Sequence, residues 1–359
     1  DVNGDGFNDL IVGANGDDPN GSYSGASFVV FGKTDGTAVE LSAIEAGTGG
    51  FVINGVSEGD QLGRSVSSAG DVNGDGFADL IVGARFDDPN GSSSGASFVV
   101  FGKTDGTAVE LSSVEAGTGG FVINGVSEGD SSGRSVSSAG DVNGDGFDDL
   151  IVGASGDDPN GTSSGASFVV FGKTDGTAVE LSAIESGTGG FVINGVSADD
   201  LSGRSVSSAG DVNGDGFDDL IVGANGDDPN GDRSGASFVV FGKTDGTAVE
   251  LSSVEAGTGG FVINGVSEGD SSGRSVSSAG DVNGDGFDDL IVGASGDDPN
   301  GTSSGASFVV FGKTDGTAVD LSDVEAGTGG FVINGVSEFD RSGTSVSSAG
   351  DVNGDGFDD

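Results

Sequence analysis

Residues 1–14 read DVNGDGFNDLIVGA, an acidic, glycine-rich loop followed directly by an apolar run. The first nine residues of this stretch recur every 70 residues with almost no change. A fixed period of this kind indicates a repeat architecture, in which each unit buries its apolar faces against its neighbours. The chain divides into five repeats and the start of a sixth, which span residues 1–70, 71–140, 141–210, 211–280, 281–350 and 351–359.

The loop has the composition of a cation site. Its oxygen-bearing side chains stand at Asp1, Asn3, Asp5 and Asp9, and Gly6 permits a sharp turn between them. Oxygen ligands suit hard cations such as Ca²⁺, whereas softer metals prefer thiolate and imidazole, and the chain has no cysteine or histidine. Loops of this composition also form turns without binding a metal. The repetition of the whole pattern favours calcium over a simple turn.

The residue at position 12 separates this loop from related calcium loops. An EF-hand needs a carboxylate at that position and a helix after it. Val12 stands there instead, inside an apolar run. We therefore exclude an EF-hand, and a dockerin-type loop on the same ground.

The chain is strongly acidic, with 59 acidic residues against 12 basic ones and a formal net charge of −47. The basic residues recur at fixed repeat positions, and we expect them to form no basic cluster. A surface of this sign repels phosphate, so the sequence predicts binding neither to nucleic acid nor to anionic lipid. No run is long and apolar enough to cross a membrane, so we expect no membrane insertion. The periodic basic positions are Lys33, Lys103, Lys173, Lys243 and Lys313, and Arg64, Arg134, Arg204 and Arg274, with Thr344 in the last copy.

Each repeat contains four short runs that are typical of strands. Leu10–Val12, Phe28–Phe31 and Phe51–Ile53 are rich in β-branched or aromatic residues and bounded by turn residues, and Ser65–Ala69 is a weaker fourth run. The spacing within Val39–Ile44 fits either a helical turn or a fifth extended stretch. Long helices are disfavoured by the 74 glycines of the chain. Four short strands per repeat predict an all-β fold, a β-propeller of four-stranded blades, rather than a sandwich or a helical solenoid.

The order of these motifs resembles a known family. Residues 63–84 (GRSVSSAGDVNGDGFADLIVGA) and 95–103 (GASFVVFGK) are similar to the FG-GAP repeat, which builds the propeller of integrin α-subunits and of many bacterial surface proteins. The resemblance covers all five repeats. It implies that Arg64–Ala69 is the innermost strand of a blade. Family propellers usually have seven blades, and the chain has five repeats. Residues 345–349 would complete the first blade and close a ring of five, or else the chain is a slice of a longer open array.

The resemblance also implies a ligand set, namely the side chains at loop positions 1, 3, 5 and 9 and the backbone carbonyl at position 7. We expect about one structural Ca²⁺ per repeat. The corresponding residues are Asp1, Asn3, Asp5, Phe7, Asp9; Asp71, Asn73, Asp75, Phe77, Asp79; Asp141, Asn143, Asp145, Phe147, Asp149; Asp211, Asn213, Asp215, Phe217, Asp219; Asp281, Asn283, Asp285, Phe287, Asp289; and Asp351, Asn353, Asp355, Phe357, Asp359.

The sequence offers no convincing catalytic residues. Without histidine the repeated serines cannot form a Ser–His pair. Paired acids such as Asp17–Asp18 are typical of turns. Variation is confined to a few loop positions, where Tyr23 becomes serine or arginine, Asn15–Gly16 becomes Arg85–Phe86, and Gly59 becomes Phe339. Drift explains so few changes slightly better than a binding surface does.

These observations predict a calcium-stabilised, non-enzymatic structural or adhesive protein of the cell surface or extracellular space. Its expected partners are calcium, further copies of itself in a fibre or sheath, or an extracellular glycan or protein. The alternative is a lectin-like or protein-binding module that acts through its loops. Because the sequence starts and stops inside the repeated motif, we expect a slice of a longer or processed chain.

Overall fold

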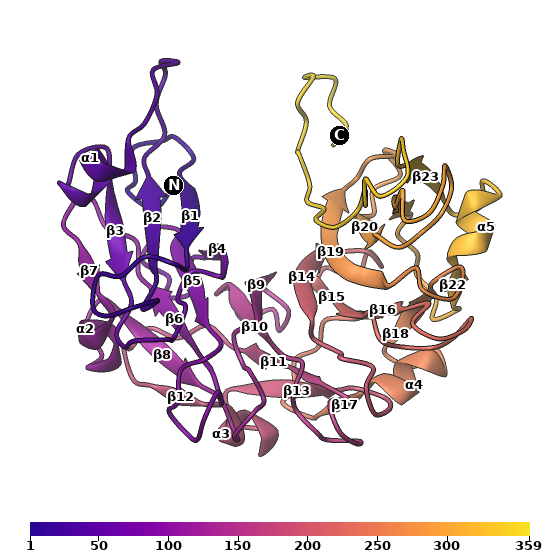
Figure 1. Ribbon diagram of the computed structural model, residues 1–359, viewed down its shortest axis with the longest axis horizontal. Helices are drawn as coiled ribbons and strands as arrows, with labels where there is room; N and C mark the ends of the chain where they lie inside the picture. The colour runs from indigo at the N-terminus through magenta and orange to yellow at the C-terminus, as the bar shows by residue number, and fades with distance from the viewer.

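A computed structural model describes all residues 1–359 of the chain. The strands form five separate sheets, one for each repeat. Figure 1 shows the sheets arranged in an open arc, with β4, β9, β14 and β19 toward its centre and the short helices on its outside. The fold is therefore all-β with five repeats, as the sequence predicts.

The sheet of the second repeat shows how one unit is built. Its strands run outward from the centre in the order β4, β5, β6, β8 and β12. The innermost strand, β4, comes from the end of the first repeat, whereas β5, β6 and β8 come from the second, and these four strands pair antiparallel. The innermost position of the Ser65–Ala69 segment and the order of the three runs after it confirm the sequence prediction. The strands are β4 (Ser65–Gly70), β5 (Asp79–Ala84), β6 (Ala96–Val100), β8 (Gly120–Asn124) and β12 (Val179–Glu180).

The other repeats form equivalent strands. The remaining innermost strands are β9 (Ser135–Gly140), β14 (Ser205–Gly210) and β19 (Ser272–Gly280). The second strands are β1 (Leu10–Ala14), β10 (Asp149–Ala154), β15 (Asp219–Ala224) and β20 (Asp289–Ala294). The third strands are β2 (Ala26–Val30), β11 (Ala166–Val170), β16 (Ala236–Val240) and β21 (Ala306–Val310). The fourth strands are β3 (Gly50–Asn54), β13 (Gly190–Asn194), β18 (Gly260–Asn264) and β23 (Gly330–Asn334).

The connector whose structure the sequence left open forms both an extended stretch and a helical turn. In four repeats its first two residues pair parallel with the outer strand of the preceding sheet, so neighbouring repeats interlock. These outermost strands are β7 (Val109–Glu110), β12, β17 (Val249–Glu250) and β22 (Val319–Asp320). The helices that follow are α1 (Leu41–Glu45), α2 (Leu111–Glu115), α3 (Leu181–Glu185), α4 (Leu251–Glu255) and α5 (Leu321–Glu325).

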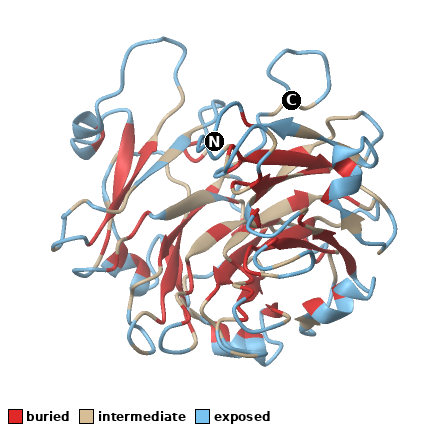
Figure 2. Ribbon diagram, turned by 45° about the vertical axis from the view of Figure 1, so that its right-hand side comes forward, coloured by how far each residue is buried: buried red, intermediate tan, exposed pale blue.

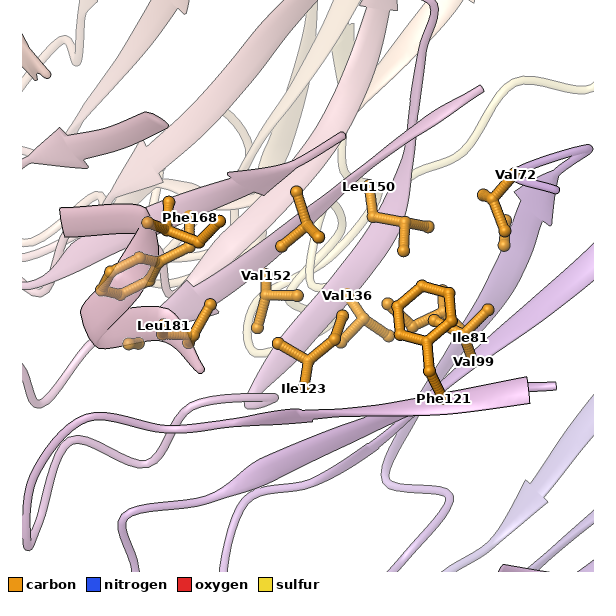
Figure 3. Packing of buried hydrophobic residues seen from close by; sticks show 14 of the residues in the cluster. Val72, Ile81, Val99, Phe121, Ile123, Val136, Leu150, Val152, Phe168 and Leu181 are labelled. Atoms are coloured by element: carbon orange, nitrogen blue, oxygen red, sulfur yellow. The ribbon is translucent and has the colours of Figure 1, made fainter. Parts of the chain in front are cut away.

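Interior sheets are buried on both faces. Along β5, Leu80 and Val82 pack with residues of the first repeat, whereas Ile81 packs with residues of the third. This alternation follows from the two-residue period of a strand. Figure 3 shows one core between two sheets, where Phe121 and Leu150 meet. Burying a large apolar side chain such as Phe121 or Leu150 contributes about 1.5–3 kcal/mol, so packing between neighbouring sheets stabilises the arc.

The two ends of the arc lack this cover. Leu10 is 66% exposed in β1, while its equivalent Leu80 is 4% exposed in β5. Residues 345–349 form no strand with β1, and the N–H of Val346 donates to the Oγ of Ser275 in β19. The ring closure that the sequence left open is therefore not formed in this structure. In Figure 2 the buried residues lie mainly in the strands, whereas the loops and much of the helices are exposed.

Candidate functional site: acidic loops and central arginines

The acidic loop joins the innermost strand to the second strand. The carboxylate at its first position accepts hydrogen bonds from backbone N–H groups later in the same loop. In the second repeat, Asp71 Oδ1 accepts from the N–H groups of Gly74 (2.7 Å) and Asp75 (3.0 Å), and Oδ2 accepts from that of Gly76 (2.9 Å). The Phe77 N–H donates to Asp75 Oδ1 over 3.0 Å. All six loops repeat the contact between the position-1 carboxylate and the position-4 N–H, at 2.6 to 2.7 Å.

The carboxylate at position 9 is the buried end of the loop. Asp79 is fully buried and accepts from the N–H groups of Val72 (3.1 Å) and Gly102 (2.8 Å). Burial raises the pKa of Asp79 to about 7, and the nearby charges of Asp75 and Asp71 add to the effect. Burial likewise raises the pKa of the equivalent residues, to about 8 for Asp149 and Asp219 and about 6 for Asp289. Each of these loops has acids at positions 1, 5 and 9 and contains no basic side chain.

The donor chemistry of the loop suits Ca²⁺, but the carboxylates do not converge. Positions 1, 3, 5 and 9 carry three carboxylates and one amide, whose oxygens are suitable calcium ligands. Asn73 lies beside Asp79, and its Nδ2 is 3.4 Å from Asp79 Oδ1. No three acidic side chains come close enough to share one cation. The position-1 oxygens accept backbone N–H groups instead. Calcium binding at these residues, and the part of the position-7 carbonyl, stay predictions.

The loops also contact one another, through a position that the sequence reasoning overlooked. Asp148, at position 8 of the third loop, accepts from the Asp71 N–H at 2.7 Å. The ring of Phe147 lies against Gly74, which has a φ of 73° and no room for a side chain, since a Cβ there would stand 2.6 Å from that ring. The same hydrogen bond links the later loops. The position-8 carboxylates of Asp218, Asp288 and Asp358 accept from the N–H groups of Asp141, Asp211 and Asp281, respectively.

The repeated lysine strengthens the same junction. The Lys103 N–H donates to the Val2 carbonyl at 2.8 Å, and its ammonium lies 4.8 Å from the ring centre of Phe51 in the preceding repeat. The ammonium also pairs with Asp105 at 2.9 Å. Hydrogen bonds from Thr107 and Lys103 hold the pKa of Asp105 well below its usual range. The periodic lysines are therefore contacts between repeats.

The periodic arginines come together, which contradicts the expectation that the chain has no basic cluster. Arg64, Arg134, Arg204 and Arg274 line one cavity of about 410 Å³, together with Ser65, Ser275 and Thr344 and no apolar residue. Each arginine directly precedes the SVSSAG segment of an innermost strand, and these strands lie side by side at the centre of the arc (Figure 1). Residues 70 positions apart thus gather around one axis. The period in the sequence was the signal that could have revealed the cluster.

These guanidinium groups have no acidic partner. Every ion pair in the structure involves one of the five repeated lysines. Burial, and then the charges of Arg134, Arg274 and Arg64, together lower the pKa of Arg204 to about 10. Burial and neighbouring arginines also lower the pKa of Arg134. The cavity is thus a concentration of positive charge in a chain with a net charge of −47.

The variable loop positions lie beside these arginines. A second cavity of about 270 Å³ is lined by Arg274 and Thr344 together with equivalents of Gly59, Asn15, Gly16 and Tyr23. Those equivalents are Gly269, Ser295, Gly296 and Ser303, and Ser271 and Arg341 complete the lining.

Arg85, at one of the variable positions, stands close to the central arginines. Its guanidinium lies 4.3 Å from the ring centre of Phe86, and its buried Nε has no hydrogen-bond partner. Burial lowers the pKa of Arg85, and the charges of Arg64 and Arg204 lower it further. Sequence variation and unpaired positive charge therefore occupy one region.

The repeated serines have structural partners. Ser65 Oγ accepts from the Val136 N–H at 3.0 Å, and Ser135 Oγ donates to the Gly203 carbonyl at 2.9 Å. These bonds join neighbouring innermost strands.

None of the helices is long and apolar enough to cross a membrane.

Comparison with known proteins identifies similar repeats elsewhere. A family profile described as "FG-GAP repeat" matches residues 1–30, 62–100, 132–170, 202–240 and 272–310, just over half of the chain. Integrin alpha-PS5 of Drosophila melanogaster is 32% identical over 162 residues, which is 44% of this chain and 14% of the relative.

Two further relatives carry related names. Integrin alpha-4 of Xenopus laevis is 27% identical over 175 residues, which is 48% of this chain and 15% of the relative. Integrin alpha-7 of Mus musculus is 34% identical over 154 residues, which is 43% of this chain and 11% of the relative. The matched part is therefore a small fraction of each relative.

Proposed function

Because the chain belongs to the FG-GAP repeat family, we propose that it is a calcium-stabilised, propeller-type adhesive or protein-binding module of an extracellular or cell-surface protein. The observation that carries this proposal is the row of nearly identical acidic loops, of which the second to the sixth are hydrogen-bonded one to the next. A cation bound in such a loop would stabilise a unit and its junction together.

The expected size of the calcium effect supports a structural role. Extracellular calcium modules bind with Kd values on the order of 10⁻⁴–10⁻³ M. At ten times Kd, each site adds about 1.4 kcal/mol to stability by mass action. Several sites acting together would supply a large part of the ~5–15 kcal/mol that holds a typical domain folded. The acids occur identically in every repeat, and their role in construction favours a non-enzymatic protein.

The variable loops supply the binding part of the proposal. Tyr23 is 57% exposed and Phe339 is 63% exposed, and both stand where other repeats have small or polar residues. Exposed aromatic side chains and arginines are enriched among the residues that dominate protein interfaces. A partner protein or glycan would therefore contact this side of the arc.

The test is a binding assay on purified protein against a panel of extracellular-matrix proteins and glycans, with calcium and with chelator. The test variant is Arg85→Ser/Phe86→Gly, which copies the residues of the third repeat and so preserves the fold. We expect saturable, calcium-dependent binding to a panel member that this variant weakens at least tenfold. The matched control, Ser155→Ala, should bind normally. Absence of saturable binding, or binding indifferent to calcium, would contradict the proposal.

A structural role through self-association is the second candidate. It is favoured by apolar side chains exposed at both ends of the arc, with Leu10 at 66%, Phe331 at 44% and Ile333 at 48%. Repeated contacts between different surfaces generate filaments when they do not close. Sedimentation at increasing concentration should then show growing assemblies, and a monomer at every concentration would rule out this candidate.

A further inference from the structure

We propose that the cavity between Arg64, Arg134, Arg204 and Arg274 binds a small anion that carries two or more carboxylate, sulfate or phosphate groups. This site is separate from the acidic loops, which lie at the opposite ends of the innermost strands. The inference does not depend on calcium binding or on adhesion.

The first argument is the lack of internal partners. Four guanidinium groups converge on one space, and none pairs with a carboxylate, although the chain has 59 acidic residues. Like charges held together in a partly buried space repel one another, which is unfavourable unless an anion balances them. Burial, and then the charges of neighbouring arginines, lower the pKa of both Arg134 and Arg204.

The second argument is the chemistry of the lining. Guanidinium groups form paired hydrogen bonds with carboxylate, sulfate or phosphate oxygens. The remaining lining residues, Ser65, Ser275 and Thr344, are also polar, and no apolar side chain faces the space. The cavity therefore suits a ligand whose whole surface is polar.

The third argument limits the size of the ligand. The volume of about 410 Å³ accommodates a small molecule. A long polyanion such as nucleic acid would extend beyond the arginines over a chain whose net charge is −47 and would be repelled there. A compact anion with several charged groups gains contacts with several arginines and avoids that repulsion.

The experiment is calorimetric titration of the intact chain at constant ionic strength in chloride. Ethane-1,2-disulfonate is compared with methanesulfonate, and succinate with acetate, so that each pair differs in the number of charged groups. These probes chelate calcium weakly. We expect one divalent anion per chain, bound at least tenfold more tightly than its monovalent analogue. Comparing the affinities of the two divalent probes will show whether the site prefers sulfonate or carboxylate oxygens. Equal affinity within both pairs, or no saturable binding, would overturn the proposal.

Variants connect the binding to the named residues. Arg134→Gln/Arg204→Gln should weaken binding of the divalent probe at least tenfold. Arg233→Gln removes one positive charge, as each of those two substitutions does, but from an exposed loop outside the cavity, and it should bind as the wild type does. If the double variant fails to fold, Arg64→Gln, at an exposed position, replaces it. Unchanged affinity in these cavity variants would overturn the proposal.

A gain of binding provides an independent check. Thr344 lines the cavity at the repeat position where four other copies have arginine. Thr344→Arg should therefore tighten binding of the divalent probe severalfold. An arginine at this position that fails to tighten binding would contradict the assignment.

Discussion

The two ends of an innermost strand have opposite characters. Beyond the last residue of β9 lies the acidic loop that starts at Asp141, whose carboxylate is saturated by backbone N–H groups of its own loop. Before its first residue stands Arg134, whose guanidinium has no acidic partner. The acidic end varies only at loop position 8, whereas several loop positions near the arginine end vary. One end therefore links neighbouring repeats by hydrogen bonds, and the other carries positive charge that no acid in the chain balances.

The largest expected effect comes from the buried position of an acidic loop. Asp149→Ala would leave the N–H groups of Val142 and Gly172 without their acceptor, and we expect a loss of about 2–4 kcal/mol in unfolding free energy. Asp149→Asn keeps an acceptor and should lose clearly less. Denaturant unfolding in chelator measures both. Equal losses for the two variants would show that these hydrogen bonds do not stabilise the loop.

A pH effect should arise at a buried acid that is outside the proposed metal ligands. Asp200 is buried, accepts from the Ser197 N–H, and faces Asp227, Asp228 and Glu255. Burial first, and then Asp227, raises the pKa of Asp200 to about 7 from an ordinary value of 3.8. The folded state therefore binds a proton more readily than the unfolded state, so this contribution is complete below pH 4 and is lost as the pH rises through 7.

Asp200→Asn mimics the protonated acid and should remove this pH dependence. At pH 8 we expect the variant to be more stable than the wild type by about 1–2 kcal/mol, because water screens part of the effect. At pH 5 the gain should be clearly smaller, because the unfolded acid has begun to ionise and only part of the contribution has been lost. Denaturant unfolding at both pH values measures the difference, and a gain that is the same at pH 5 and pH 8 would contradict it.

The link between loops should have a smaller effect. Asp148→Ala removes the acceptor of the Asp71 N–H, and we expect a loss of about 1 kcal/mol. The second loop already has Ala78 at this position, so the change is compatible with the loop itself. The control is Asp158→Ala, because the Asp158 carboxylate accepts only the Ser163 N–H in its own turn and makes no contact between repeats. If hydrogen exchange in the loop at 71–79 is unchanged in Asp148→Ala, the loops do not support one another.

The smallest effect is expected at the arginine end. Arg134→Gln removes no hydrogen bond or ion pair and relieves repulsion from neighbouring arginines. Its unfolding free energy should lie within about 0.5 kcal/mol of the wild type, as for substitutions away from stabilising contacts. A loss above about 1 kcal/mol would mean that the arginine supports the fold, and the comparison between the two ends would fail.

Much of the fold could be predicted, because it depends on local patterns. Runs such as Leu80–Val82 and Phe98–Val100 are apolar, bounded by turn residues and too short for helices, so they had to be buried strands. The connector was ambiguous because Val109–Glu110 is extended only by pairing with the preceding sheet. The equivalent Val39–Glu40 forms no strand, since no sheet precedes it in the structure.

The site was harder to predict, because its main features join different repeats. The acidic loop is recognisable from its own residues, but the hydrogen bond between the Asp71 N–H and Asp148 joins residues 77 positions apart in the sequence. The arginines are 70 positions apart, and only the arrangement of the innermost strands brings them together. Likewise, nothing in the sequence of β1 distinguishes Leu10 from the buried Leu80, because burial depends on the neighbouring sheet.

The most direct test of the account is the thermal unfolding of the wild type and of Asp145→Ala, each with calcium and with chelator. Asp145 is exposed and its carboxylate accepts only the N–H of Phe147 in the same loop, so without calcium its replacement by alanine should change the melting temperature little. With calcium, we predict that the wild type melts at a clearly higher temperature and that the variant loses part of this gain. Melting temperatures of both proteins that do not respond to calcium would contradict the claim that the acidic loops hold the repeats together by binding calcium.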